Sequence, residues 1–255
     1  MTYFCTLASG SSGNCHLYVS DRVCILIDAG TTTKYITNAL AKLNLTLADI
    51  THILVTHGHS DHVGALPVLL KRTTAPVYCT ADTADYIRFP EGRWAETFVA
   101  GECLNLCGCP VQTFATPHDI SGSCGFVLGQ GSERVTVCTD LGAMTGEIFA
   151  QMQGSALVCL ESNHDEVLLK NGPYPYPLKQ RILSDCGHLS NVACSKVAVR
   201  LAQTGTRRLI LAHLSRENNH PRLALETTLE ALRCAGAELD VQVAPAAEPG
   251  NPVLL

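Results

Sequence analysis

Charged residues are scarce in this 255-residue chain, making up 16% of it, against roughly 25% in typical soluble proteins. Hydrophobic residues make up 46%, and this balance excludes intrinsic disorder, because disordered chains are charge-rich and poor in hydrophobes. A run of about 18 apolar residues, as a membrane-spanning helix needs, is also lacking. The N-terminus has no basic segment ahead of an apolar run, so we expect no signal peptide.

Internal repeats, low-complexity tracts and long linkers are lacking as well. The length suits one large domain or two small ones. Because no domain boundary is visible, we expect a single domain over residues 1–255. The net charge of −5 argues mildly against a general nucleic-acid binder, because such proteins are usually basic.

The 13 cysteines are scattered along the chain, and most lie inside apolar runs. There a cysteine behaves as a small buried hydrophobe. Without an export signal, this pattern favours a reduced, cytoplasmic protein over a disulfide framework. Only Cys103, Cys107 and Cys109 cluster. Their spacing matches no common zinc knuckle, and their role is left open.

Short apolar runs rich in β-branched residues predict ten strands beyond the N-terminal one. They cover residues 15–20, 22–28, 50–56, 75–80, 109–116, 124–129, 133–140, 155–161, 207–213 and 239–244. Helical patterns cover residues 33–45, 190–205 and 221–237, with Ser190 as an N-cap and Pro221 in a first turn. Two similar halves, each with strands before helices, predict an α/β fold in which two sheets pack face to face with helices outside. This is a four-layer αββα sandwich.

The strongest local signal is the segment T-H-G-H-S-D-H, which contains His57, His59, Asp61 and His62. It follows a buried strand and precedes a helical pattern. Residues i and i+2 of an extended chain point the same way, so His57 and His59 can face one metal ion. Asp61 and His62 can turn toward a second ion as the helix begins. Imidazole and carboxylate ligands suit zinc, manganese or iron.

One segment cannot fill two coordination shells, so further ligands must come from elsewhere. His118, Asp140 and His213 each follow a predicted strand. Ligand-type residues at several strand ends indicate one functional edge of a rigid scaffold. Asp140 suits a bridging position, because a carboxylate has two oxygens to share.

This order of ligand residues resembles the metallo-β-lactamase superfamily over residues 1 to about 220. The resemblance implies that His57, His59 and His118 hold one metal ion and that Asp61, His62 and His213 hold the other, with Asp140 between them. Asp28 would orient a ligand histidine without binding metal itself. His59 replaces the glutamate of the oxygen-reducing di-iron branch, which favours a hydrolase. No cysteine stands at a ligand position, which argues against lactam substrates.

Three further segments are similar to the YycJ/WalJ group of bacterial proteins, which is related to RNase Z and RNase J. They are L-A-S-G-S-S-G-N near the N-terminus, E-S-N-H-D from Glu161, and G-H-L-S-N from Gly187 taken with H-L-S-R-E-N-N from His213. That group is associated with 5′-to-3′ exonuclease activity on DNA. The sequence departs from it at Gly58, where relatives are often acidic, and in lacking an inserted clamp domain for nucleic acid.

The same segments supply candidates for phosphate chemistry. Ser11, Ser12 and Asn14 lie in a small, flexible loop that can approach an anion closely. His188 precedes a predicted helix and is a candidate to contact phosphate or to protonate a leaving alkoxide. Glu161 either lines the cleft or braces His188 and His213. A local basic track for a DNA backbone would look the same in sequence as solvated helix faces. Its candidate residues are Lys179, Arg181, Lys196, Arg200 and Arg216.

We therefore expect a phosphodiesterase with two divalent metal ions, and Asp61 and His188 are its candidate catalytic residues. A hydroxide bridging zinc, manganese or iron ions would attack phosphorus, with developing charge neutralised by the ions. By resemblance, the expected partner is DNA with a 5′ end, in a repair setting, and no membrane. The alternative is a small-molecule metallohydrolase for a thioester, lactone or cyclic nucleotide. A non-catalytic scaffold is disfavoured, because all seven ligand positions are filled. Oligomeric state cannot be read from the sequence.

Overall fold

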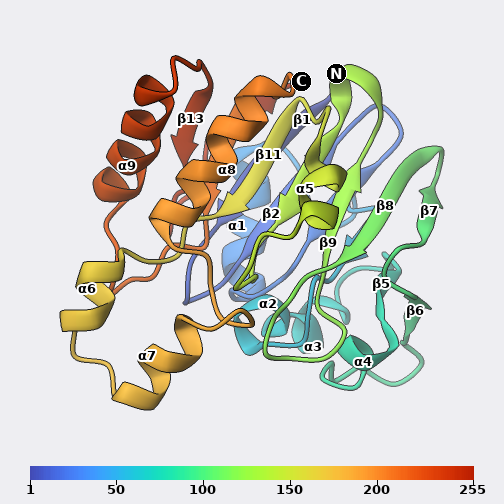
Figure 1. Cartoon of the computed structure of the whole chain (residues 1–255). Helices are drawn as coiled ribbons and strands as arrows, with labels where there is room; N and C mark the ends of the chain where they lie inside the picture. Colours follow the sequence, from blue (N-terminus) through green and yellow to red (C-terminus); the bar gives the residue numbers. More distant parts are fainter. The chain divides into compact units, whose positions relative to one another are not determined.

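The computed structural model describes every residue from Met1 to Leu255 and divides into two compact units (Figure 1). Unit 1 comprises Met1–Thr113, Ile120–Cys124 and Pro245–Leu255, and unit 2 comprises Phe114–Asp119 and Gly125–Ala244. Each unit has its own strands and helices. The expectation of a single domain stays a prediction.

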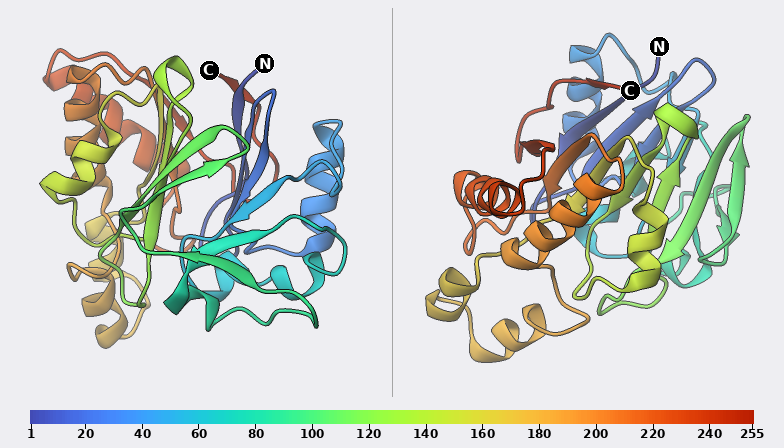
Figure 2. Two further views of the ribbon diagram at one scale, coloured as in Figure 1. Left: turned by 90° about the vertical axis from the view of Figure 1, so that its right-hand side faces the viewer. Right: turned by 45° about the horizontal axis from the view of Figure 1, so that its top comes forward.

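Unit 1 is built on a seven-stranded mixed sheet with the order β14-β1-β2-β3-β4-β5-β6. The strands are β1 (Tyr3–Ala8), β2 (Cys15–Val19), β3 (Cys24–Ile27), β4 (His52–Leu54), β5 (Val77–Thr80), β6 (Ala95–Phe98) and β14 (Val253–Leu254). Pairing is antiparallel from β14 to β3 and parallel from β3 to β6. Because β14 pairs with β1, the two ends of the chain lie side by side in both views of Figure 2.

The helices of unit 1 are α1 (Thr33–Lys42), α2 (Ser60–Val63), α3 (Leu66–Leu69) and α4 (Ala81–Ala84). Thr32 caps α1 by accepting a hydrogen bond from the backbone N–H of Tyr35. Ile36 and Leu40 lie one turn apart on α1, and both are buried in the core formed with the sheet. Leu66 of α3 joins the same core.

The hairpin of β7 (Cys103–Leu106) and β8 (Cys109–Ala115) carries the three clustered cysteines. Cys103 and Cys107 are exposed, whereas Cys109 is buried. None of them belongs to a cluster of potential metal ligands with mutually close donor atoms. The Cys107 Sγ atom lies 3.9 Å from Nε2 of His52. The geometry therefore gives no support for zinc at these cysteines.

In unit 2, neighbouring strands run in the order β13-β12-β11-β10-β9. They are β9 (Cys124–Leu128), β10 (Val135–Cys138), β11 (Leu157–Glu161), β12 (Arg208–Ala212) and β13 (Asp240–Val243). β9 is antiparallel to β10, and β10 to β13 are parallel. Of these, β10, β11 and β12 are buried on both faces, as their continuous apolar runs predict, whereas β13 at the end of the sheet is partly exposed.

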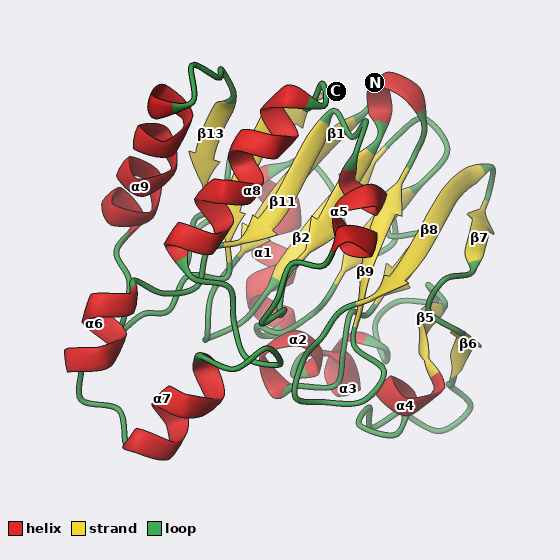
Figure 3. Cartoon of the chain, in the orientation of Figure 1, coloured by secondary structure: helices red, strands yellow, loops and turns green.

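The helices of unit 2 are drawn in red in Figure 3. They are α5 (Gly146–Met152), α6 (Glu166–Asn171), α7 (Tyr176–Ile182), α8 (Asn191–Gln203) and α9 (Pro221–Cys234), with a short 3₁₀ turn at Gly131–Glu133. Phe149, Val197 and Ala224 bring α5, α8 and α9 into one core with the strands. None of the helices in either unit is both long and apolar enough to cross a membrane.

The predicted α/β class is confirmed, because each unit contains a mixed sheet with helices packed on it. Ser190 caps α8 as predicted, and Pro221 opens α9. The thiols inside apolar strands are buried as expected, and burial raises the pKa of Cys24 to about 12. Sequence patterns did not indicate β6, β7 or α4 to α7.

Candidate metal centre

The histidine-rich segment lies where β4 ends and α2 begins. His57 and His62 are fully buried, whereas His59 and Asp61 are half-buried. Nε2 of His57 lies 3.1 Å from Nδ1 of His59. Alternation along the extended chain thus brings these two imidazoles together.

His62, on the first turn of α2, is held by a buried carboxylate. Its Nδ1 atom lies 2.8 Å from Oδ2 of Asp28, and both side chains are inaccessible to solvent. The backbone N–H and the hydroxyl of Thr56 also donate to Asp28, at 2.8 and 2.9 Å. A carboxylate that accepts from Nδ1 fixes the tautomer and leaves the lone pair on Nε2.

The Ser-Gly loop lies against the other side of this segment. Asn14 is fully buried, and its side-chain amide lies 3.0 Å from Nε2 of His62 and 3.4 Å from Oδ2 of Asp61. Its backbone N–H donates to the carbonyl of Asp61 at 2.8 Å. Ser11 and Ser12 are exposed at the tip of the loop. Asn14 therefore positions Asp61 and His62, while the two serines face solvent.

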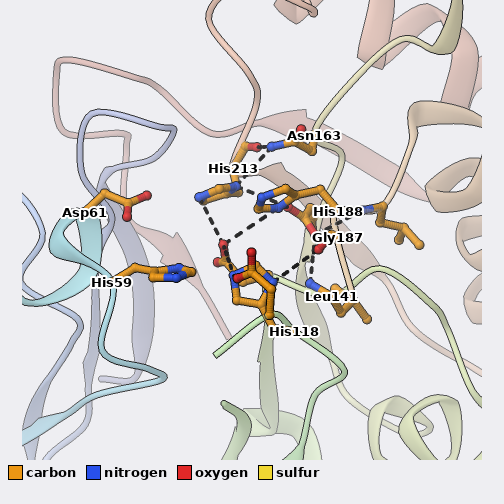
Figure 4. A network of polar contacts seen from close by, with 12 residues as sticks. His59, Asp61, His118, Leu141, Asn163, Gly187, His188 and His213 are labelled. Carbon is orange, nitrogen blue, oxygen red and sulfur yellow. Dashed lines mark hydrogen bonds and ion pairs between the residues drawn. The ribbon is translucent and has the colours of Figure 1, made fainter. Parts of the chain in front are cut away.

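In unit 2, three strand ends and the segment before α8 bring four side chains into a compact cluster, part of which is drawn in Figure 4. They are Asp140, Glu161, His188 and His213, whose candidate donor atoms all lie within 4.8 Å of one another. Nε2 of His213 lies 3.3 Å from Oδ1 of Asp140. Three strands, β10, β11 and β12, supply all of these residues except His188.

Glu161 is the centre of this cluster. Its Oε1 atom lies 2.7 Å from Nδ1 of His188 and 3.1 Å from Nδ1 of His213. Its Oε2 atom accepts from the backbone N–H groups of Leu141 and Leu189, at 3.0 and 3.1 Å. Burial opposes the charged carboxylate, but the two histidines outweigh it and lower the pKa of Glu161. Burial acts to lower the pKa of His188, but the charge and the hydrogen bond of Glu161 together have the larger effect. The pKa of His188 is therefore raised.

His118 follows β8 and lies at the edge of the same cluster. Its Nδ1 atom donates to the carbonyl oxygen of Gly187 at 3.2 Å, and its Nε2 atom lies 3.8 Å from Oδ1 of Asp140 (Figure 4). Asp119 lies 3.3 Å from the same Nε2 and forms an ion pair with Arg181. Sequence reasoning did not single out Asp119, although its place directly after His118 is a signal.

Four of the histidines share one arrangement. The Nδ1 atoms of His62 and His213 lie beside the carboxylates of Asp28 and Glu161, and that of His118 beside a backbone carbonyl. For His57 the partner is the hydroxyl of Thr56, at 3.0 Å. Each ring therefore keeps Nε2 as its ligand atom, which is the arrangement that metal-binding histidines need. Thr56 was not predicted, although it stands next to the motif.

Three residues of the site have a left-handed backbone conformation, unlike the extended residues before them. Asp28, Asp140 and His213 have φ angles of 59°, 58° and 54°. Each stands just after a strand, and the left-handed turn ends the extended chain there. Non-glycine residues adopt this region rarely, and strain of this kind gathers at functional sites.

The residues of the E-S-N-H-D segment have different structural roles. The side-chain amide of Asn163 donates to the carbonyl of His213 at 2.9 Å, so it braces that ligand. Asp165 caps α6 by accepting from two backbone N–H groups. His164 is buried without a hydrogen-bond partner for either ring nitrogen, and burial lowers its pKa to about 4.

Three of the five residues of the candidate basic track make contacts within the fold. Lys179 donates to the carbonyls of Lys170 and Gly172, at 2.8 and 2.7 Å, where α6 ends. Arg200 stacks 3.7 Å above the ring of Phe149. Arg181 forms an ion pair with Asp119, so these three side chains stabilise the fold.

The donor set fits divalent metal ions. Imidazole nitrogens and carboxylate oxygens without thiolates are ligands that zinc, manganese and iron all accept. The buried cluster of unit 2 alone offers two carboxylates and two imidazoles. Packing so many polar groups without water is costly unless a cation or hydrogen bonds compensate.

Comparison with known proteins gives the family. The family profile described as "Metallo-beta-lactamase superfamily" matches residues 8–153. The chain belongs to the metallo-β-lactamase superfamily. It is 32% identical over 243 residues to "Exodeoxyribonuclease WalJ" of Streptococcus pneumoniae (strain D39), which covers 93% of this chain and 90% of that protein. It is 31% identical over 238 residues to "Exodeoxyribonuclease YycJ" of Bacillus anthracis, covering 92% and 90%.

The fold agrees with this membership. The crystal structure of the metallo-β-lactamase fold protein YhfI from Bacillus subtilis aligns with a TM-score of 0.72 at 14% identity, over 98% of this chain and all of that one. The predicted sandwich class of the metallo-β-lactamase type and the predicted resemblance to the YycJ/WalJ group are thus confirmed. The chain is a metal-dependent hydrolase of this superfamily, and its cofactors are divalent metal ions.

Proposed function

We propose that this hydrolase is an exodeoxyribonuclease of the cytoplasm that degrades DNA from a 5′ end with two divalent metal ions, in a repair setting. The observation that carries the proposal is its similarity, along nine-tenths of its length, to two proteins named exodeoxyribonucleases. The arrangement of Glu161 and His188 supports it chemically.

Two sets of ligands would hold the metal ions. His57, His59 and His118 would bind one ion; Asp61, His62 and His213 would bind the other; Asp140 would bind both. Zinc or manganese suits these donors, with iron as a further candidate. When bound, the ions supply a water of lowered pKa and neutralise charge that develops on the phosphoryl oxygens.

His188 is proposed as the group that protonates the leaving oxygen. Its Nδ1 atom is hydrogen-bonded to Glu161 at 2.7 Å, so Nε2 is the nitrogen available to substrate. Because Glu161 raises the pKa of His188, the imidazole holds its proton to higher pH than a free histidine and can give it to the leaving oxygen. Glu161 itself acts through His188 and is a positioning residue.

This acid favours a phosphodiester over the alternative thioester. A sugar alkoxide is a strongly basic leaving group and departs far more easily when it is protonated. A thiolate is much less basic, since ordinary thiols have a pKa of about 8.5. A buried carboxylate that keeps a histidine protonated therefore serves phosphodiester cleavage better than thioester cleavage.

Phosphate contacts are proposed for Ser11, Ser12 and His188, and Asn14, predicted with them, is proposed to hold their loop in place. The exposed serines have hydroxyl groups at the loop tip, where a phosphate can approach. Asn14 is tied to Asp61 and His62, so its contribution would be to hold the loop against the metal ligands.

The test uses one DNA strand in two labelled forms, with Mn²⁺, Zn²⁺ or EDTA. A 5′-phosphorylated strand labelled at its 3′ end should shorten progressively. The same strand labelled at its 5′ end should release the label at once as a mononucleotide. Asp61→Ala/His62→Ala should abolish both signals, and the exposed carboxylate variant Glu91→Ala serves as the matched control with full activity.

The opposite labelling pattern would reverse the polarity and leave the nuclease intact. If the strand stays intact with every metal, the DNA substrate is wrong. A panel of thioesters, lactones and cyclic nucleotides would then test the alternative.

A further inference from the structure

A tyrosine occupies the space beside the glycine of the His-Gly-His motif. A Cβ atom added to Gly58 would lie 2.5 Å from Cγ of Tyr86 and 2.6 Å from its Cβ and Cδ2 atoms. Real Cβ atoms do not approach other atoms so closely. Tyr86 therefore lies directly on the backbone between His57 and His59, and only glycine at position 58 permits this contact.

The fold brings Tyr86 to this place by strand pairing. β5 is parallel to β4, with Tyr78 opposite Leu54. The chain leaves β5 at Thr80 on the same edge at which His57 follows β4, passes through α4, and reaches Tyr86. Parallel strands end at one edge of a sheet, so this relation is a consequence of topology.

The position of Tyr86 is fixed by its neighbours. Its backbone N–H donates to the carbonyl of Thr83 at 3.1 Å. The hydroxyls of Thr80 and Thr83 are joined at 2.9 Å, and Thr80 also donates to the carbonyl of Gly122 at 2.9 Å. Ile87, the next residue, is buried in the core of unit 1. A turn held in this way fixes the direction in which the Tyr86 side chain leaves the backbone.

Packing in the core does not account for the ring. Tyr86 is 52% exposed although it contacts Gly58, so much of the side chain remains open to solvent beside two candidate metal ligands. A rigidly held, half-exposed aromatic side chain offers a face on which a planar ligand can stack. Nucleobases stack on such side chains without sequence preference, because every base has a π-face.

We propose that Tyr86 is a substrate-contacting residue on which the base of a nucleotide near the scissile bond stacks. The inference rests on the proposed function, since it takes DNA as the substrate. It assigns two tasks to one short segment of the site. The histidines of the motif bind metal for the phosphate, and the bare backbone of Gly58 makes room for the residue that holds the base.

The experiment compares wild type with Tyr86→Leu, Tyr86→Phe and Trp94→Leu. The control residue Trp94 is 67% exposed and precedes β6, whose Ala95 pairs with Val77 at the start of β5, so it lies at the opposite edge of the sheet. Substrates are single-stranded oligonucleotides that are intact or carry one abasic nucleotide at each of the three terminal positions of either end. Cleavage is measured as kcat/KM with Mn²⁺. Binding is measured by fluorescence anisotropy in EDTA, where cleavage does not interfere.

Tyr86→Leu should lower kcat/KM and affinity on intact DNA by about 5- to 150-fold, the size of one base–aromatic stack. Loss of the base at one position should reduce the wild-type values similarly and shrink the difference between the two proteins to less than about twofold. Tyr86→Phe should keep the wild-type values, because the ring remains, and Trp94→Leu should match wild type throughout.

An equal loss for Tyr86→Leu on intact and abasic DNA would overturn stacking and leave a role in supporting Gly58. A loss in Tyr86→Phe equal to that in Tyr86→Leu would overturn it in favour of the hydroxyl group. DNA that is bound with this base dependence but never cut would sink the proposed function and support the contact. DNA that is neither bound nor cut would overturn both.

Discussion

The carboxylate of Glu161 bonds to Nδ1 of His188 at 2.7 Å while accepting two backbone N–H groups through its other oxygen. A buried charge in this position is compensated on all sides, and it keeps a proton on the neighbouring imidazole. The protonation of His188 therefore depends on the hydrogen bonds that hold Glu161 in its charged form.

His188 should therefore set the alkaline limb of the pH profile. Its raised pKa means that it stays protonated to higher pH than a free histidine, and activity that needs the proton falls as pH rises through that pKa. Glu161→Gln removes the charge and should move this fall to lower pH. Single-turnover cleavage rates between pH 5 and 9 measure the limb. His188→Ala should abolish it and lower the rate about 10²- to 10⁴-fold with metal content unchanged. An unmoved limb in Glu161→Gln would contradict the role of this pair.

Asp28→Asn should weaken metal binding without unfolding the protein. Asparagine tolerates the left-handed backbone of this position, with φ at 59°, but brings no charge to Nδ1 of His62. Loss of such a partner typically costs 10- to 100-fold in metal affinity. Competitive chelator titration measures the affinity, and circular dichroism checks the fold. Unchanged affinity would show that Thr56 and Asn14 hold His62 without the carboxylate.

Asn14→Ala should separate two tasks of the Ser-Gly loop. Because the side-chain amide of Asn14 donates to the carboxylate and the carbonyl of Asp61, its loss should leave that ligand less well positioned and lower metal affinity. Ser11→Ala/Ser12→Ala should leave metal affinity intact and raise KM for DNA, because these hydroxyls are exposed at the loop tip. Metal titration and steady-state kinetics on both variants give the comparison. Equal metal affinity in Asn14→Ala and wild type would return Asn14 to a phosphate contact.

Arg93→Ala should destabilise unit 1. The guanidinium donates to the carbonyls of Leu70, Thr73 and Ala75 at 3.2, 2.5 and 2.6 Å, in the turn between α3 and β5. Hydrogen bonds from a charged donor make a substantial contribution, and we expect a loss of about 2–4 kcal/mol in the free energy of unfolding by urea. The exposed Arg88→Ala is the control and should change it by less than about 0.5 kcal/mol. A loss in Arg93→Ala as small as that would show that water replaces these bonds.

Local patterns were enough to predict much of the fold and the ligand candidates. The His57–His62 segment could be recognised from sequence because residues i and i+2 of an extended chain lie on the same side, which brings His57 and His59 together. Long helices such as α8 were readable because cap, periodicity and length agree. The short helices α4 to α7 carry too few residues for a period, and β6 and β7 are half-exposed strands with little apolar signal.

What could not be predicted depends on contacts between residues distant in sequence. Glu161 serves His188 and His213 at once, and the sequence allowed either a bracing or a cleft-lining role. The contact of Tyr86 with Gly58 joins positions 28 residues apart through parallel strand pairing. Sequence spacing alone contains neither relation.

The left-handed turns at Asp28, Asp140 and His213 lower the stability of the fold at positions that the metal centre needs. Backbone of this kind costs of order 1–3 kcal/mol at a non-glycine residue, and glycine would relieve it. A protein selected only for thermal stability would therefore drift toward glycine at these positions and lose two proposed metal ligands together with the carboxylate that holds His62. Such a descendant should keep the sheets and helices and unfold at a higher temperature, but it should no longer bind metal ions or cleave its substrate.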